Sequence, residues 1–398
     1  MPASAAGAYF DNNATTPPLP AVVEAMRPCL EANFGNASSI HRQGQQARAM
    51  IEAARAAAAE LIGAEPNEIV FTSGGTEADN LALFGMIPEP RGAHLIVSAI
   101  EHHAVLHAAR ELAERGAAVS WLPATRDGRV RPTDVEQALR PETRLISVML
   151  ANNETGVIQP IEAIGRIARQ ARVPLHVDAV QAAGKIPVSV EELGCSLLSF
   201  SAHKFHGPQG VGALYARRGT RLRPLFYGGR HERERRAGTE NLAGIAGMGA
   251  AARLALRDLE AEARRQSRMR DALEAAVKQS IPEAEALGAE APRVPNTSCL
   301  HIPGIAGEAL VIALDLRGYC ISTGAACSSG AVEPSHVLTA MGLEDAEARA
   351  CVRISLGKLN REAEAEAFCR ILPAEIARLL ELSPARHAKI KSGAISVA

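Results

Sequence analysis

Several residues that could do chemistry lie where apolar segments of the sequence end. Lys204 follows the apolar segment LLSFSA, with Ser201 and His203 beside it and glycines after it. Only six of the 43 basic residues are lysines, so a lysine here indicates a need for an amine that can lose its proton. Such an amine can form a Schiff base with an aldehyde. A strand-end lysine that reaches solvent is the simpler alternative, and its neighbours decide between the two.

Asp178 ends another apolar segment, PLHVDA, twenty-six residues before Lys204. A carboxylate buried there needs a partner, because burial of an isolated charge is costly. The protonated nitrogen of a pyridine ring is one such partner. An arginine in a structural ion pair is the other.

A pair of glycines in FTSGGTEADN separates a strand-like run from a helix-like run. Gly75 and Thr76 therefore lie at the start of the expected helix, where backbone N–H groups attract a phosphate. An ordinary capped turn is the alternative. A phosphate cradle, an acid and a lysine on strands of one parallel sheet are together the components of a pyridoxal 5′-phosphate (PLP) site.

Histidines and one cysteine extend this set. His103 and His107 could share a helix face, but the HExxH order is absent and no third ligand has suitable spacing, so we expect no metal. His102 is better placed to stack on a cofactor ring, and the unperturbed pKa of a histidine, ~6.5, suits a proton relay.

Cys327 lies among small residues in GAACSSGAVEPSH, which favours a nucleophile on a mobile loop over a buried thiol. A disulfide with Cys320 is the alternative.

A sheet must bring these distant residues together. Between about residues 65 and 216, β-rich runs alternate with helical patterns, which predicts an α/β fold with a mostly parallel, seven-stranded sheet. The runs are EIVFTS, HLIVSA, AVSWLP, LISVML, PLHVDA, LLSFSA and VGALYA. A long helix over about 242–279 then leads to a smaller α+β domain. We place the large domain at 13–260 and the small one at 1–12 together with 261–398.

Composition excludes several classes of protein. A length of 398 residues exceeds one hydrophobic core, and a net charge of −1 argues against binding to nucleic acid or membrane through bulk charge. No apolar run approaches the ~20 residues that span a bilayer, and the start lacks a signal-peptide pattern. Seven cysteines without a CxxC pair argue against a disulfide framework. We therefore expect a cytoplasmic protein without nucleic-acid or membrane partners.

The chain resembles the PLP-dependent cysteine desulfurases of aminotransferase class V essentially from end to end. Ten segments carry the resemblance: YFDNNATTP, FGNASSIH, EIVFTSGGTEADNLA, EHHAV, LANNETGVIQPI, HVDAVQAAGK, SAHKFHGPQGVG, RRAGTENLAGIAG, GAACSSGAVEPSHVL and VRISLGKLN. The resemblance implies the PLP-dependent transferase fold type I. The segment RPLFYGGRHERERRAGTEN is most similar to the nitrogen-fixation branch, NifS, and the housekeeping branch is the near alternative.

The resemblance also implies roles for individual residues. Lys204 corresponds to the Schiff-base lysine, Asp178 to the pyridinium partner and Gln181 to a hydrogen bond with the phenolic oxygen. His102 matches the ring-stacking position, and Cys327 matches the catalytic cysteine. The other cofactor positions bind the phosphate: Gly75, Thr76, Ser201, His203 and, from the neighbouring subunit of a homodimer, Thr239. Asn153 and Arg353 match contacts to the substrate carboxylate.

The implied reaction converts L-cysteine into L-alanine and leaves sulfur on Cys327 as a persulfide. An iron–sulfur scaffold protein would accept that sulfur, for nitrogenase or for general cluster assembly. A selenocysteine lyase would share the PLP site and differ at the cysteine loop. An amino-acid transaminase would need no cysteine, and a non-catalytic assembly factor would need neither the lysine nor the acid.

Overall fold

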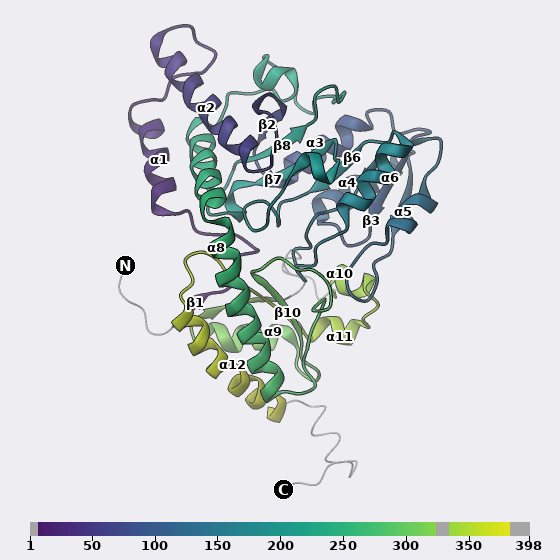
Figure 1. Cartoon of the computed structure of the whole chain (residues 1–398), viewed down its shortest axis with the longest axis vertical. Coiled ribbons are helices and arrows are strands. Elements are labelled where there is room, and N and C mark those ends of the chain that lie inside the picture. The colour runs from purple at the N-terminus through teal and green to yellow at the C-terminus, as the bar shows by residue number, and fades with distance from the viewer. Residues whose placement is uncertain (1–6, 324–333, 383–398) are drawn as a thin grey trace.

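The computed structural model describes residues 7–323 and 334–382. They form a seven-stranded sheet and a four-stranded sheet joined by one long helix, and a further two-stranded sheet (Figure 1). The larger sheet has the strand order β2-β8-β7-β6-β5-β3-β4. Its strands are β2 (Ile69–Thr72), β3 (His94–Ser98), β4 (Ala118–Leu122), β5 (Thr143–Ser147), β6 (Leu175–Asp178), β7 (Leu197–Ser201) and β8 (Gly212–Ala216). Only β8 runs antiparallel to its neighbours. The predicted mostly parallel, seven-stranded sheet is confirmed.

Helices cover both faces of this sheet. They are α1 (Pro20–Glu31), α2 (Arg42–Glu60), α3 (Gly75–Met86), α4 (His103–Glu114), α5 (Pro132–Ala138), α6 (Ile161–Ala171), α7 (Val190–Leu193) and α8 (Leu242–Ser280), with 3₁₀ turns η1 (Pro66–Glu68), η2 (Ala202–Lys204) and η3 (His231–Glu234). In the described part of the chain, no helix combines the length and apolarity needed to cross a membrane.

Successive strand residues enter two different cores, which is why the strands read as continuous apolar runs. In β3, Leu95 and Val97 pack in one core and Ile96 packs in the other. The core that contains Leu95 and Val97 includes residues of α3 and α4. The core that contains Ile96 includes residues of α2, α6 and α8. A parallel sheet with helices on both faces requires such strands. The carboxyl ends of its parallel strands are left to position the site.

The long helix α8 leads from the larger sheet to the smaller one (Figure 1). Its 39 residues correspond to about 58 Å of helix. One half packs on α1 and α2, and the other packs on the last helix, α12. The smaller region comprises β1 (Ala8–Tyr9), β9 (Glu285–Ala286), β10 (Thr297–His301), β11 (Tyr319–Cys320), β12 (Ser322–Thr323) and β13 (Cys351–Ser355), with α9 (Gly307–Asp315), α10 (His336–Ala340), α11 (Asp345–Arg349) and α12 (Glu362–Leu382).

The smaller sheet is antiparallel, in the order β12-β13-β10-β9, and has its own core. The N-terminal strand β1 joins this region by pairing with β11 in parallel. Behind it, the rings of Phe10, Tyr319 and Phe368 pack within 5.0–6.1 Å of one another. The domain limits at 13–260 and 261–398 stay a prediction.

A buried ion pair holds a strained turn against the edge of the larger sheet. Glu232, Arg233 and Glu234 in η3 all have positive φ angles, between 45° and 65°, which is a costly conformation for side chains of this size. The Glu232 carboxylate accepts hydrogen bonds from Arg55 at 2.7 and 2.8 Å and from the Phe71 backbone N–H in β2 at 2.9 Å. Both side chains of the ion pair are almost fully buried. The turn therefore depends on Glu232.

Replacing Glu232 with glutamine should destabilise the fold strongly. The change leaves the buried Arg55 guanidinium with only the partly exposed Glu52 carboxylate as a counter-charge, and loss of the buried partner of such a pair costs about 3–5 kcal/mol. Chemical denaturation of the two proteins measures the loss. Glu234→Gln is the matched control, because Glu234 also has a positive φ but its ion pair with Arg230 is exposed; it should cost less than about 1 kcal/mol. Equal losses for the two variants would contradict the role of Glu232.

Candidate active site

A pocket of about 360 Å³ lies at the carboxyl ends of the parallel strands, with β13 of the smaller sheet contributing to its wall. Strands that are distant in the sequence each bring a predicted residue to it. Lining it are the predicted site residues Gly75, Thr76, His102, Asn153, Asp178, Gln181, Ser201, His203, Lys204 and Arg353. Thr239 does not line it and is exposed. Cys327 lies outside the described residues.

Lys204 ends the short turn η2 directly after β7, and its amine is at the pocket. The Nζ atom donates hydrogen bonds to the backbone carbonyls of Asn13 and Ala14, both at 2.7 Å. Lys204 is therefore held within the protein and does not simply extend into solvent. This position suits an amine that must reach a bound aldehyde.

Asp178 is buried at the end of β6 without an ion pair to any arginine in the described residues. Its Oδ1 accepts a hydrogen bond from the Val180 backbone N–H at 2.8 Å. Burial raises the pKa of this carboxyl to about 6. A structural arginine partner, the alternative considered from sequence, is not what the structure shows. A protonated ring nitrogen would supply the missing counter-charge.

The glycine turn before α3 forms a close-fitting cradle. A side chain on Gly75 would place a Cβ 2.8 Å from the Val180 side chain, so only glycine leaves this space open. The buried Ser201 hydroxyl beside it has no hydrogen-bond partner among the described residues. An anion with several acceptor oxygens fits the hydroxyl and the helix N-terminus together. The residues present therefore fit the phosphate of PLP.

His102 caps the N-terminus of α4, and its Nδ1 accepts a hydrogen bond from the Ala104 backbone N–H at 3.1 Å. The ring proton of the neutral side chain is therefore on Nε2. Burial, reinforced by the charge of Lys204, lowers the pKa of His102 to about 4. The pKa of His102 is therefore lower than the unperturbed value of a histidine, which is all that the residue type gives. A neutral ring suits stacking, and its Nε2–H is a hydrogen-bond donor.

Arg353 is a buried residue of β13, with an exposed fraction of 2%. Its guanidinium donates to the Asp11 carboxylate at 2.6 Å and to the Asn153 carbonyl at 3.1 Å. Its Nε has no partner among the described residues. A guanidinium has five N–H donors, so several stay available for a substrate carboxylate.

Among the described residues, no cluster of three or more histidine, cysteine or acidic side chains could hold a metal ion.

Asn13 is the central residue that sequence reasoning missed. Its backbone carbonyl accepts hydrogen bonds from Lys204 and from Gln181, and its side-chain carbonyl accepts from Lys185 and Asn296. The sequence signal was weak, since Asn13 is one of two adjacent asparagines in YFDNNATTP. Its partners lie far along the chain, so only the folded structure reveals the network.

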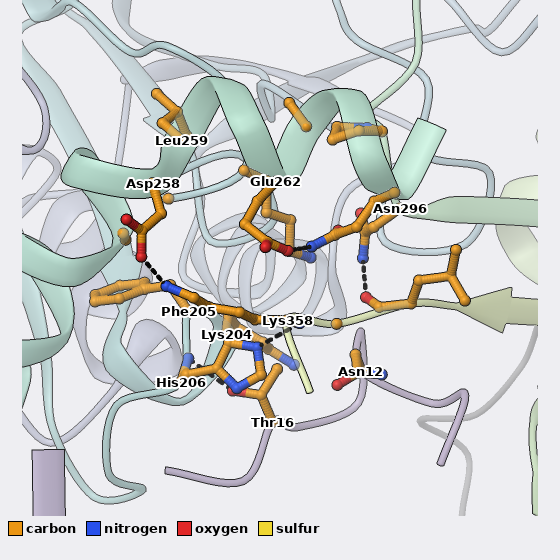
Figure 2. Close-up of a pocket in the computed structure, with 18 of the residues that line it drawn as sticks. Asn12, Thr16, Lys204, Phe205, His206, Asp258, Leu259, Glu262, Asn296 and Lys358 are labelled. Carbon is orange, nitrogen blue, oxygen red and sulfur yellow. Dashed lines mark hydrogen bonds and ion pairs between the residues drawn. The ribbon is translucent and has the colours of Figure 1, made fainter. Parts of the chain in front are cut away.

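A second, much smaller cavity lies on the other side of Lys204, against α8 (Figure 2). Lys358 pairs with Asp258 there, and its backbone N–H donates to His206 at 3.0 Å. These contacts connect α8, the segment after β13 and the turn that carries Lys204.

Comparisons with known proteins agree with this site. A family model described as aminotransferase class V matches residues 8–368. The curated cysteine desulfurase IscS of Dictyoglomus turgidum is 45% identical over 378 residues, covering 94% of this chain and 96% of that protein. A solved structure described as a NifS-like protein has a TM-score of 0.87 at 37% identity, covering 94% of this chain and 100% of that one. Another, described as SspA in complex with cysteine, has a TM-score of 0.75 at 35% identity, covering 87% and 98%.

The chain belongs to the aminotransferase class-V family and has the fold of the PLP-dependent transferases. The predicted enzyme class, a PLP-dependent cysteine desulfurase, is confirmed. Relatives named IscS and structures described as NifS-like both match, so these comparisons do not separate the two branches.

Replacing Asp178 with asparagine should stabilise the cofactor-free protein and weaken PLP binding. The carboxyl has a pKa of about 6 when folded and about 3.9 when exposed. The unfolded chain therefore loses the proton first, and stability falls as the pH rises from about 4 to about 6. Asparagine does not ionise, so we expect a gain of about 1–3 kcal/mol at pH 7.5 that shrinks toward pH 4.

Chemical denaturation of the cofactor-free proteins at both pH values measures this gain. Titration with PLP measures the expected loss of affinity. A variant that is less stable than the parent at pH 7.5, or that binds PLP equally well, would contradict the assignment of Asp178.

Proposed function

We propose that the protein converts L-cysteine into L-alanine and transfers the sulfur to Cys327 as a persulfide that feeds iron–sulfur cluster assembly. The observation that carries this proposal is the convergence of Lys204, Asp178 and Arg353 on one pocket from three separate strands. The match to a relative named as a cysteine desulfurase and to a structure of a protein in complex with cysteine supports the substrate.

Different residues of the pocket would bind the cofactor and the substrate. Asp178 would pair with the ring nitrogen of PLP, Gln181 would donate to its phenolic oxygen, and the cradle at Gly75 would hold its phosphate. Bound PLP supplies an electron sink for negative charge that develops on the substrate. Arg353 holds the substrate carboxylate with parallel hydrogen bonds, together with Asn153.

Lys204 and Cys327 act on the substrate itself. The Lys204 amine removes the proton from Cα and later returns one. The thiolate of Cys327 then attacks the substrate sulfur, so that an S–S bond forms and the Cβ–S bond breaks. The electron pair of the broken bond stays with Cβ, which takes a proton and gives alanine. The neutral His102 ring would stack on the cofactor, and its Nε2–H is the group left to donate to the substrate, because Nδ1 already accepts from the Ala104 backbone N–H. The substrate thiol proton can stay on the transferred sulfur.

Two relatives are named IscS, and these names favour general iron–sulfur cluster assembly as the use of the sulfur. A supply dedicated to nitrogenase is the second candidate, and the resemblance of RPLFYGGRHERERRAGTEN to the NifS branch favours it. Disruption of the gene in its host separates the two. Loss of growth only on dinitrogen indicates the dedicated role, and loss of growth on fixed nitrogen indicates the general one.

We further propose that the enzyme is a cytoplasmic homodimer. Thr239 is exposed and lies away from the pocket of its own chain. Close by, Arg236 pairs with Glu77 in the first turn of α3, at 2.8 and 3.2 Å. This contact ties the segment before Thr239 to α3 and leaves the exposed Thr239 side chain available to a neighbouring subunit.

Replacing Cys327 with alanine should abolish sulfur transfer and leave cofactor binding intact. The nucleophile and the electron sink act in different steps, so the variant should still bind PLP and change its spectrum with L-cysteine. Sulfide and alanine release, with dithiothreitol as the acceptor, measures the loss. Cys320→Ala is the control, because Cys320 is a partly exposed free thiol among the described residues and should retain activity. Full sulfide production by Cys327→Ala would overturn the assignment.

A mixed dimer tests whether Thr239 acts across the subunit interface. A hydrogen bond to a charged group is worth about 1.5–3 kcal/mol, so Thr239→Ala should weaken PLP binding by roughly ten- to a hundredfold. In a heterodimer of Thr239→Ala and Lys204→Ala subunits, one site has an intact lysine and a threonine from its partner. That site should bind PLP like the parent enzyme. If it shows the weakened affinity of Thr239→Ala, the threonine acts within its own subunit.

A further inference from the structure

Lys185 is a partly buried lysine that lies beside the candidate active site and does not line its pocket. Two tight turns follow β6, and they bring Lys185 back over Gln181. The Nζ atom of Lys185 donates to Gln181 Oε1 at 2.5 Å and to Asn13 Oδ1 at 2.8 Å. Neither the family resemblance nor the comparisons assign this residue a role.

The amide of Gln181 is held at both ends. Its oxygen accepts from Lys185, and its Nε2 donates to the Asn13 backbone carbonyl at 2.9 Å. A carbonyl only accepts, so rotating the amide by half a turn would oppose two oxygens there. In the observed orientation Nε2 keeps a second N–H group, and Gln181 lines the pocket.

We propose that Lys185 is a positioning residue, which anchors Gln181 so that the amide presents an N–H donor to the phenolic oxygen of PLP. The inference rests on the proposed function, which takes Gln181 as the partner of that oxygen. An unanchored amide could turn its own oxygen toward the negatively charged phenolic oxygen, which would repel it. Lys185 would thereby affect the pKa of the bound cofactor without contacting the cofactor.

The anchoring does not depend on the charge of Lys185. Burial, together with the charges of Lys204 and Arg353, lowers the pKa of Lys185 well below its ordinary value. A neutral amine has two N–H donors and an ammonium has three, and two acceptors face this nitrogen. Either form can hold Gln181 and Asn13 together.

The pH titration of the visible absorption band of the PLP-loaded enzyme tests the proposal. A donor to the phenolic oxygen stabilises the negative charge that grows there when the chromophore loses its proton. Lys185→Met removes the anchor, so we expect the pKa of the band to rise by about one unit and PLP to bind roughly tenfold more weakly. Lys185→Arg retains the donors and should recover at least half of the shift.

Two further proteins separate anchoring from charge and from general damage. In a Gln181→Met background, Lys185→Met should cause no further shift, because Lys185 acts through the amide. Lys358→Met removes another partly buried lysine, whose amine pairs with Asp258, and should leave the pKa of the band unchanged. If Lys185→Met does not fold, Lys185→Gln replaces it, since its shorter side chain does not reach Gln181 Oε1.

Three outcomes would overturn the role of Lys185 while leaving the proposed function in place. They are an unchanged pKa in Lys185→Met, an equal shift in the Gln181→Met background, and an equal shift in Lys358→Met. Absence of any PLP absorption band from the parent protein would instead contradict the proposed function. The two failures are therefore distinguishable.

Discussion

The hydrogen bonds of Asn13 join Lys204 to both the larger and the smaller sheet. Its backbone carbonyl accepts from Lys204, and its side-chain amide donates to Thr297 in the smaller sheet at 2.8 Å. Its backbone N–H donates to Ser355 in β13 at 2.9 Å. A buried amide with every group satisfied permits one arrangement of its neighbours, because an unmade hydrogen bond there is costly. The relative placement of Lys204 and Arg353 follows from this constraint.

The site also concentrates acidic groups that lack counter-charges. Asp178 lies near Asp79 and Glu101, and burial raises the pKa of all three carboxyls, that of Glu101 to about 8. His176 beside Asp79 is itself buried, which lowers its pKa to about 3 and leaves it uncharged at neutral pH. A positively charged ring nitrogen beside Asp178 would supply the counter-charge that these carboxyls lack and would favour the ionised form of Asp178. Cofactor binding and the stability of the protein are therefore coupled through the same buried acids.

The smaller sheet contributes binding groups to a site built on the larger one. Arg353 reaches the pocket because β13 pairs with β10 and the N-terminal residue Asp11 bridges to Ser355 of the same strand. The chain thus passes along β13 of the smaller sheet before it begins the larger sheet. This path of the chain places the Asp11 carboxylate against the guanidinium of Arg353. The hydrogen bond between them fixes the orientation of the guanidinium plane.

The sequence by itself determined the strands, the helices and the residues at strand ends, because apolar periodicity and glycine turns are local patterns. Lys204, Asp178 and Gly75 could be named for that reason. The burial of Arg353, the lowered pKa of His102 and the anchoring of Gln181 by Lys185 could not. They depend on which surfaces pack together, and the contacts of Asn13 with Lys204 and Thr297 join residues 191 and 284 positions apart. No local pattern encodes such contacts, so only the tertiary structure decided them.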